Sequence, residues 1–218
     1  MTPTRRLRRA SSIEDARILF AQYDIVPAPT SGRVTGYFDK STNSRHDLMP
    51  EVLISSGTPI LDLPGLLSLR PFFFVIKANA IAGYIHYSDL NRPPARAPFY
   101  AQLEAVENVI SRRMAGVVAD ADVKAITSPS RYSQLKRHLD RRRSQNLDLG
   151  WTAVLSLGEL LRLARRYHTL KLEDEDLALV TRFRNRVAHA SLRLIEKHSE
   201  VRELSKVSAL LDMIVRST

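Results

Sequence analysis

The first 95 residues contain an internal repeat that constrains the fold more than any other feature of this sequence. When the chain is shifted by 47 residues, Gly36-Tyr37-Phe38 falls on Gly83-Tyr84-Ile85, and the turn residues Ser31-Gly32 fall on Ala78-Asn79. Asn79 replaces a glycine at the turn because asparagine tolerates positive φ. Each copy is therefore predicted to form a helix–strand–turn–strand unit, and the two copies predict a mixed α and β region.

The apolar patterns of the two copies place their elements. The expected elements are helices at 13–23 and 64–69 and strands at 25–29, 33–38, 72–76 and 81–85. Ser12 is suited to be the N-cap of the first helix. The proline-rich segment 91–98 breaks the pattern, so we expect one domain over residues 1–95 and a second over residues 96–218.

The second copy ends with Gly83-Tyr84-Ile85-His86-Tyr87-Ser88-Asp89. This segment resembles the signature of CBS domains, which is a Gly, two apolar residues, a Ser or Thr, two variable residues and an Asp. Thr58-Pro59-Ile60, ahead of the second helix, also fits this family. CBS domains occur as tandem pairs that share one sheet-and-helix core, and the cleft of the pair commonly holds an adenosine nucleotide. The resemblance implies an α/β CBS pair in the first domain.

The CBS resemblance also implies a ligand site that contains Thr58, Gly83, His86 and Asp89. Gly83 would let its strand approach the partner helix, and the Asp89 carboxylate would accept hydrogen bonds from both ribose hydroxyls. His86 stands where a phosphate-contacting hydroxyl is usual. The first copy has Thr42 in place of the Asp, so one site for AMP, ADP or ATP is expected, around Asp89. The open alternative is a pair that serves only packing and dimerisation.

The remainder of the chain predicts helices and no strand. Apolar residues at helical spacing fall in the segments 99–125, 128 to past 143, 151–167, 173–195 and 200–215. Ser128 and Pro129 suit the N-cap and first turn of one helix, and the acidic residues 173–176 suit the start of another. Four or five helices with short connections predict an all-α antiparallel bundle over residues 96–218, so the fold class of the whole chain is α+β.

One of these helices carries Arg184, Asn185 and His189. A cation for phosphate, a hydrogen-bonding amide and an imidazole are the groups that metal-free cleavage of RNA needs. The expected core stripe of this helix consists of Leu179, Phe183, Val187, Ala190 and Leu194. At about 100° per residue, Arg184 and His189 lie about 140° apart and do not meet within one helix. Two copies of the helix that face each other across a dimer axis would place two Arg and two His in one cleft.

The predicted bundle with its late Arg-Asn-x-x-x-His motif resembles a HEPN domain. In that superfamily the motif marks metal-independent endoribonucleases that act as dimers, many of them in toxin–antitoxin, abortive-infection or CRISPR-linked defence systems. The resemblance implies that Arg184 binds the scissile phosphate and that His189 is the general acid or base. It also implies that Asn185 orients the imidazole or the phosphate. A homodimeric ribonuclease that needs no cofactor for catalysis and is regulated by an adenine nucleotide is therefore expected. The alternative is a non-catalytic nucleotide-sensing or RNA-binding dimerisation module, or an adaptor in a defence operon.

The net charge of +10 favours polyanionic partners. Single-stranded RNA is the expected partner, with its flanking phosphates held by Arg137, Arg141, Arg142, Arg165 and Arg166. A solvated helix face is the alternative interpretation of the basic helix. No apolar run is long enough to span a bilayer and no signal core follows the basic start, which predicts a cytoplasmic protein without a membrane partner. The chain has no cysteine and no acidic cluster spaced for a metal, so no metal site is expected.

Overall fold

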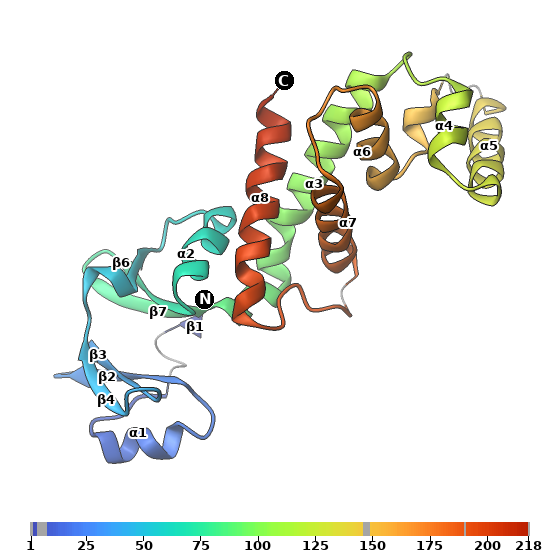
Figure 1. The fold of residues 1–218 in the computed structure, drawn as a ribbon. Coiled ribbons are helices and arrows are strands. Elements are labelled where there is room, and N and C mark those ends of the chain that lie inside the picture. The colour runs from blue at the N-terminus through green and yellow to red at the C-terminus, as the bar shows by residue number, and fades with distance from the viewer. Residues whose placement is uncertain (1, 4–7, 146–148, 190, 218) are drawn as a thin grey trace. The chain divides into compact units, whose positions relative to one another are not determined.

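The computed structural model describes residues 2–3, 8–145, 149–189 and 191–217 (Figure 1). The chain forms two compact units. The first unit comprises the chain up to Arg92 together with Ile195–Val201, and the second comprises Pro93–Leu194 together with the chain from Arg202. The first unit is rich in β-structure and the second is mostly helical, so the predicted α+β class is confirmed. The expected core residue Ala190 lies outside the described residues.

Among its described residues, the first unit contains two small sheets and two short α-helices. The antiparallel sheet has the order β2 (Ile25–Thr30), β3 (Arg33–Asp39) and β4 (Ser44–Asp47). The mixed sheet has the order β1 (Thr2–Pro3), β7 (Ala80–His86), β6 (Phe72–Lys77) and β5 (Leu53–Ser55), with β5 parallel to β6. The helices are α1 (Ile13–Leu19), which ends before the expected Tyr23, and α2 (Leu63–Leu69). Ser12 caps α1 as predicted, because its hydroxyl accepts a hydrogen bond from the Asp15 N–H at 3.1 Å.

The predicted repeat is confirmed by the registers of its two hairpins. Ile25 pairs with Asp39 in the first hairpin, and Phe72 pairs with His86 in the second, so both ends are shifted by the same 47 residues. The register slips between Ala28 and Pro29 in one hairpin and between Val75 and Ile76 in the other, which are again corresponding positions. Both copies have the bulge at the same position, so the bulge is a regular part of the unit. A bulge bends its strand and changes the direction of the strand's side chains.

The turn of the second hairpin differs from the prediction for Asn79. In the first hairpin both turn residues are left-handed, with φ of 48° at Ser31 and 80° at Gly32. In the second hairpin the positive φ, 52°, falls on Ala78 instead of Asn79. A two-residue hairpin turn can take its twist from the first central residue alone, so the asparagine is not required to be left-handed.

Corresponding residues of the two copies share one hydrophobic core. Tyr37 and Tyr84 belong to it, and so do Val34 and Ile81, which are also shifted by 47 residues. The Tyr37 and Tyr84 rings both lie against Phe74, with centroids 5.7 and 5.6 Å from it. The two copies therefore pack as one body, which is the arrangement that positions the cavity described below.

The second unit contains six α-helices within the part of the chain that the structure describes. They are α3 (Pro93–Met114), α4 (Asp120–Ile126), α5 (Pro129–Arg143), α6 (Leu157–Arg166), α7 (Asp174–Ala188) and α8, whose bounds are Val201–Arg216. Helix α3 packs against α6 and α7, where the Phe99 and Phe183 rings meet edge to face with centroids 5.8 Å apart. No helix among the described residues has the length and apolar character needed to cross a membrane.

Two expectations about these helices are wrong. Helix α3 begins at Pro93, ahead of the expected start at residue 99, and includes most of the proline-rich segment, although the boundary between the units does fall within that segment, after Arg92. Pro93 and Pro94 lie in the first helical turn, where their missing N–H groups would have no partner, whereas Pro98 lies inside the helix. The expected helix over 99–125 is divided into α3 and α4, because Gly116 adopts a φ of 76° that right-handed helix does not allow. The structure therefore has more helices than the four or five expected.

Candidate functional site

Helix α7 carries the Arg-Asn-x-x-x-His motif and ends inside it. The helix was expected to continue to about Ile195, but its last residue is Ala188, and His189 follows in an extended conformation with φ −102° and ψ 107°. The Arg96 guanidinium from α3 donates hydrogen bonds to the carbonyls of Arg186, Val187 and His189, the last at 3.0 Å. Because this side chain satisfies carbonyls that a continuing helix would bind, the helix can end here.

The three motif residues are all exposed. Arg184 and Asn185 are neighbours on α7, and the Arg184 Nη1 donates a hydrogen bond to the Asn185 Oδ1 at 3.3 Å. His189 lies beyond the helix end, and its N–H donates to the Asn185 carbonyl at 3.1 Å. Among the described residues, no hydrogen bond or ion pair joins the side chains of Arg184 and His189. Within one chain, the Arg184 guanidinium and the His189 imidazole are therefore separate. Asn185 contacts Arg184 through its side chain and His189 through its backbone carbonyl.

Arg184 interacts electrostatically with Glu107 of α3. Partial burial raises the pKa of Glu107 above its ordinary value, and the positive charge of Arg184 reduces that increase. Arg184 thus has an acidic neighbour on α3 and is itself exposed.

A groove of about 1490 Å³ lies beside the motif, between α6, α7 and the segment that connects them. Its cationic lining residues are Arg162, Arg165, Arg166, Lys171, Arg182 and Arg186, against the acidic Glu173 and Asp174. The structure thus brings the predicted Arg165 and Arg166 into one groove with Asn185 of the motif. The other four cations were not predicted, because only the pairing of α6 with α7 brings them together. Such a groove suits a flexible polyanion.

Carboxylates hold three of the groove arginines. Arg165 is paired with Asp174 and Arg182 with Glu203, the latter at 2.6 Å. Hydrogen bonds and charge from Arg165 lower the pKa of Asp174 below its ordinary value. Arg166 lies 3.5 Å from Asp122, whose pKa is lowered chiefly by a hydrogen bond from Tyr167. The Arg165–Asp174 and Arg182–Glu203 pairs are exposed, so they orient their guanidinium groups and contribute little energy that a competing phosphate would have to offset.

The predicted phosphate-binding residues of α5 lie outside this groove. Arg137, Arg141 and Arg142 are exposed, whereas Leu135 and Leu139 on the same helix are buried. The Arg137 Nε donates to the Ser133 carbonyl at 3.4 Å within the helix. The structure therefore separates the predicted basic residues into two surfaces, one in the groove and one on α5.

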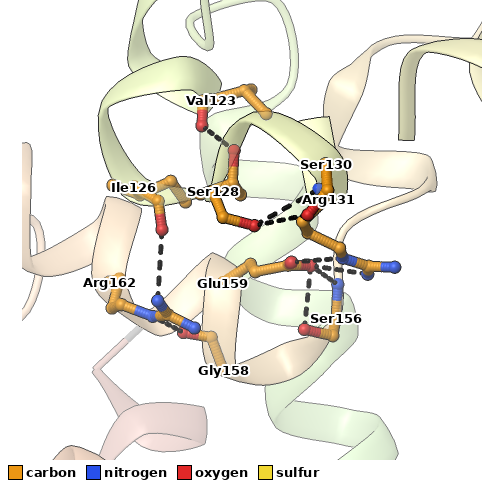
Figure 2. Close-up of polar contacts among 10 residues, drawn as sticks. Val123, Ile126, Ser128, Ser130, Arg131, Ser156, Gly158, Glu159 and Arg162 are labelled. Atoms are coloured by element: carbon orange, nitrogen blue, oxygen red, sulfur yellow. Dashed lines mark hydrogen bonds and ion pairs between the residues drawn. The ribbon is translucent and has the colours of Figure 1, made fainter. Parts of the chain in front are cut away.

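Arg131, at the start of the basic helix, has a structural role that the sequence did not reveal. Figure 2 shows its guanidinium facing the buried Glu159 of α6, with Nε 2.8 Å from Oε1 and Nη2 3.1 Å from Oε2. Glu159 also caps α6, because its carboxylate accepts hydrogen bonds from the N–H and hydroxyl of Ser156 at 2.8 and 2.9 Å. Ser128, seen in the same view, caps α5 as predicted. Arg131 is therefore held within the second unit by a buried carboxylate.

A second cavity, of about 460 Å³, lies in the first unit and includes His86 and Asp89 of the predicted ligand site. Asp89 is buried, its Oδ1 lies 2.7 Å from the Arg92 Nε, and its Oδ2 accepts a hydrogen bond from the His86 N–H at 3.0 Å. Gly83 pairs with Val75 in the sheet, and Thr58 follows β5; neither is among the residues that line this cavity. A ribose at Asp89 would have to share the carboxylate with Arg92, which the sequence did not predict.

His86 lines this cavity, and its partly buried surroundings disfavour the charged imidazolium. Burial lowers its pKa below the ordinary value, and the negative charge of Asp89 offsets part of that effect. The His86 Nδ1 accepts the Ser88 N–H at 3.3 Å, which leaves the ring proton on Nε2. In the neutral form, the Nε2–H can donate a hydrogen bond to a phosphate oxygen.

Across residues 2–3, 8–145, 149–189 and 191–217, no group of three or more histidine, aspartate or glutamate side chains is placed to hold a metal ion. In comparisons with protein-family models, with curated proteins and with solved structures, no match to this chain was found. The candidate site therefore depends on its own geometry: an exposed Arg-Asn pair, an exposed histidine at a helix end and a basic groove that opens beside them.

Proposed function

We propose that the chain is a metal-independent endoribonuclease of the HEPN type that acts as a homodimer, with a CBS-like first unit that binds an adenine nucleotide. The observation that carries the proposal is the exposed Arg184–Asn185 pair, with Asn185 opening into the basic groove. The α2, β6 and β7 order, with its copy 47 residues earlier, supports the CBS-like assignment. A defence or toxin–antitoxin role follows from the HEPN resemblance alone.

The proposed reaction is transesterification by the RNA itself. The ribose 2′-oxygen attacks the adjacent phosphorus, a 2′,3′-cyclic phosphate forms, and the bond to the 5′-oxygen of the next nucleotide breaks. His189 transfers the proton, from the attacking hydroxyl or to the leaving oxygen. Arg184 stabilises the extra negative charge on the phosphoryl oxygens, and Asn185 fixes the position of the phosphate by hydrogen bonding.

We expect purified protein to cleave labelled single-stranded RNA in EDTA. The His189→Ala variant should lose about 10²–10⁴-fold in rate, the range for removal of a general acid or base. His138→Ala is the matched control, because that histidine is exposed on α5. A substrate of the same sequence with deoxyribose should resist cleavage because it has no 2′-hydroxyl. Equal rates for wild type and His189→Ala would remove the catalytic assignment.

The groove makes a separate prediction about binding. Arg165→Gln/Arg166→Gln should make the slope of log affinity against log salt less negative by about 1.4, since each phosphate contact on a single strand contributes about 0.7. The measurement is fluorescence anisotropy with an RNA oligonucleotide in EDTA at several salt concentrations. Arg112→Gln, an exposed arginine of α3 outside the groove, is the control and should leave the slope unchanged.

The nucleotide site is tested by thermal unfolding. AMP, ADP or ATP should raise the midpoint of the wild type, because a ligand that binds only the folded state stabilises it. Asp89→Asn should abolish the increase, and Asp62→Asn, which changes an exposed carboxyl outside the cavity, should preserve it. If no nucleotide raises the wild-type midpoint, the first unit serves packing and dimerisation.

A non-catalytic RNA-binding and nucleotide-sensing module is the second candidate. The observation that favours it is the extended conformation of His189, which takes the imidazole off the helix that carries Arg184. This candidate predicts RNA binding with the salt dependence above and no cleavage product in EDTA.

A further inference from the structure

Helix α5 lies at the edge of the second unit beside α4 and is attached to the unit along one side (Figure 1). Leu135 and Leu139 are buried, and Arg131 is paired with the buried Glu159 of α6. Apart from the two leucines, all residues from 133 to 143 are exposed. The helix is therefore fixed from its inner side, and its other sides are open to a partner.

The open sides of α5 carry a cationic face, which consists of Lys136, Arg137, Arg141 and Arg142. Asp140 is the only acidic residue in the sequence of this helix. At about 100° per residue, Arg137 lies about 160° from each of the two buried leucines. Lys136 lies about 100° to one side of Arg137, and Arg142 lies about 140° to the other side. The cationic face therefore covers about 240° of the helix circumference.

The charges of this face are not neutralised in the way that the groove charges are. Among the described residues, none of its three arginines forms an ion pair with a carboxylate, whereas three groove arginines each have a carboxylate partner. Its lysine, Lys136, has only a minor interaction with Asp120 of α4. The pKa of Asp120 is lowered chiefly by hydrogen bonds from Lys124 and Tyr132, and the charge of Lys136 contributes less. The face thus remains available to an external polyanion.

We propose that the cationic face of α5 binds duplex DNA by lying in the major groove, with its two sides against the phosphates of the two strands. A flat partner can contact one side of a helix, whereas a groove contacts both sides, as an arc of about 240° requires. A helix with its side chains is about 10–12 Å across, and the major groove of B-form DNA is about 12 Å wide. The major groove of A-form RNA is deep and too narrow for side chains to read. This activity goes beyond the proposed ribonuclease and does not depend on it.

The first experiment measures binding of a fluorescent DNA duplex by anisotropy, in EDTA and at several salt concentrations. Lys136→Gln and Arg142→Gln should each make the slope of log affinity against log salt less negative by about 0.9, because each removes one phosphate contact. The double variant should change the slope by about 1.8. A change at only one of the two residues would indicate one-sided contact, and either that result or an unchanged slope overturns the proposal.

The groove provides the matched control for this experiment. Arg165→Gln/Arg166→Gln should leave the duplex slope unchanged, and the two α5 variants should leave the slope for single-stranded RNA unchanged. All of these variants should keep the wild-type midpoint of urea unfolding, because the substituted side chains on α5 are exposed. A duplex slope that responds to the groove variant and not to the α5 variants would place the duplex in the groove and overturn the proposal.

Asp140→Asn gives a result that loss of structure cannot imitate. The side chain of Asp140 is exposed and lies within the cationic face, so its charge repels the DNA phosphates. We expect the variant to bind the duplex several-fold more tightly at low salt and to lose this gain as salt screens the charge. Unchanged or weaker binding by folded Asp140→Asn would contradict the proposal.

A comparison of duplexes tests the choice of DNA. An RNA duplex of the same sequence should bind wild type at least about tenfold more weakly, because its major groove does not admit the helix. Equal affinity for the two duplexes overturns the placement in the major groove. The proposed ribonuclease is tested separately: a protein that binds duplex DNA through α5 but cuts no RNA would retain this inference and lose the enzyme. Cleavage of RNA without duplex binding would have the opposite meaning.

Discussion

Mixing Arg184→Ala protein with His189→Ala protein is expected to restore RNA cleavage that neither variant performs alone. Each substitution removes one half of the proposed chemistry, and each should lower the rate by about 10²-fold or more. In one chain the Arg184 and His189 side chains share no hydrogen bond or ion pair among the described residues, and His189 lies off the helix. A cleft built from two chains can combine the remaining arginine of one protomer with the remaining histidine of the other.

The experiment requires subunit exchange, which native mass spectrometry of differently tagged proteins would verify. Random exchange makes about half of the dimers mixed, so recovery should be a substantial fraction of the wild-type rate. A mixture of His189→Ala with His189→Ala carrying the second tag is the control and should remain inactive. Mixed dimers that form without any recovery, while wild type cleaves, would place the whole site within one chain.

Arg131→Gln is expected to destabilise the second unit far more than any other single arginine change on α5. The Glu159 side chain is 6% exposed, and without Arg131 its charge would be left in a poorly solvated position. Arg131 itself is 41% exposed, which reduces the effect, and we expect a loss of about 2 kcal/mol in the free energy of unfolding. Arg137→Gln, on the same helix and exposed, should cost about 0.5 kcal/mol or less. Urea unfolding followed by circular dichroism measures both.

The same ion pair gives a pH dependence with a defined sign. Burial acts to raise the pKa of Glu159, but hydrogen bonds from Arg131 and Ser156 outweigh it and leave the pKa below its ordinary value of 4.5. A lowered carboxyl pKa contributes stability above the unfolded pKa, and that contribution is lost as the pH falls through the folded pKa. The difference between wild type and Arg131→Gln should therefore be full at pH 7 and shrink below about pH 4. A difference that stays constant to pH 3 would contradict this role of the pair.

Features that depend on nearby residues were predictable from the sequence, and features that depend on distant ones were not. The repeat was visible in Gly36 and Gly83, and the structure keeps their registers. The end of α7 was missed because it is set by Arg96, a residue far away in the sequence that binds the last carbonyls. The structural role of Arg131 was missed for the same reason, since its partner Glu159 lies on another helix.

The candidate site shows the same division. The motif residues Arg184, Asn185 and His189 and the groove residues Arg165 and Arg166 were identified from residue type and spacing alone. Their separation into an exposed pair, a helix-end histidine and a groove depends on helix pairing, which a single sequence does not reveal. The competition of Arg92 for Asp89 was hidden because a sequence shows where a carboxylate is and not what already occupies it.

The division of the chain has a practical consequence for dissecting the protein. The polypeptide passes from the first unit to the second after Arg92, returns at Ile195 and leaves again after Val201. A truncation after Arg92 would therefore strip Asn91 and Leu67 of their partners, and a fragment that starts at Pro93 would carry an orphaned stretch ahead of α8. Because each unit contains two separate segments of the chain, studies of either activity are best made on the intact polypeptide.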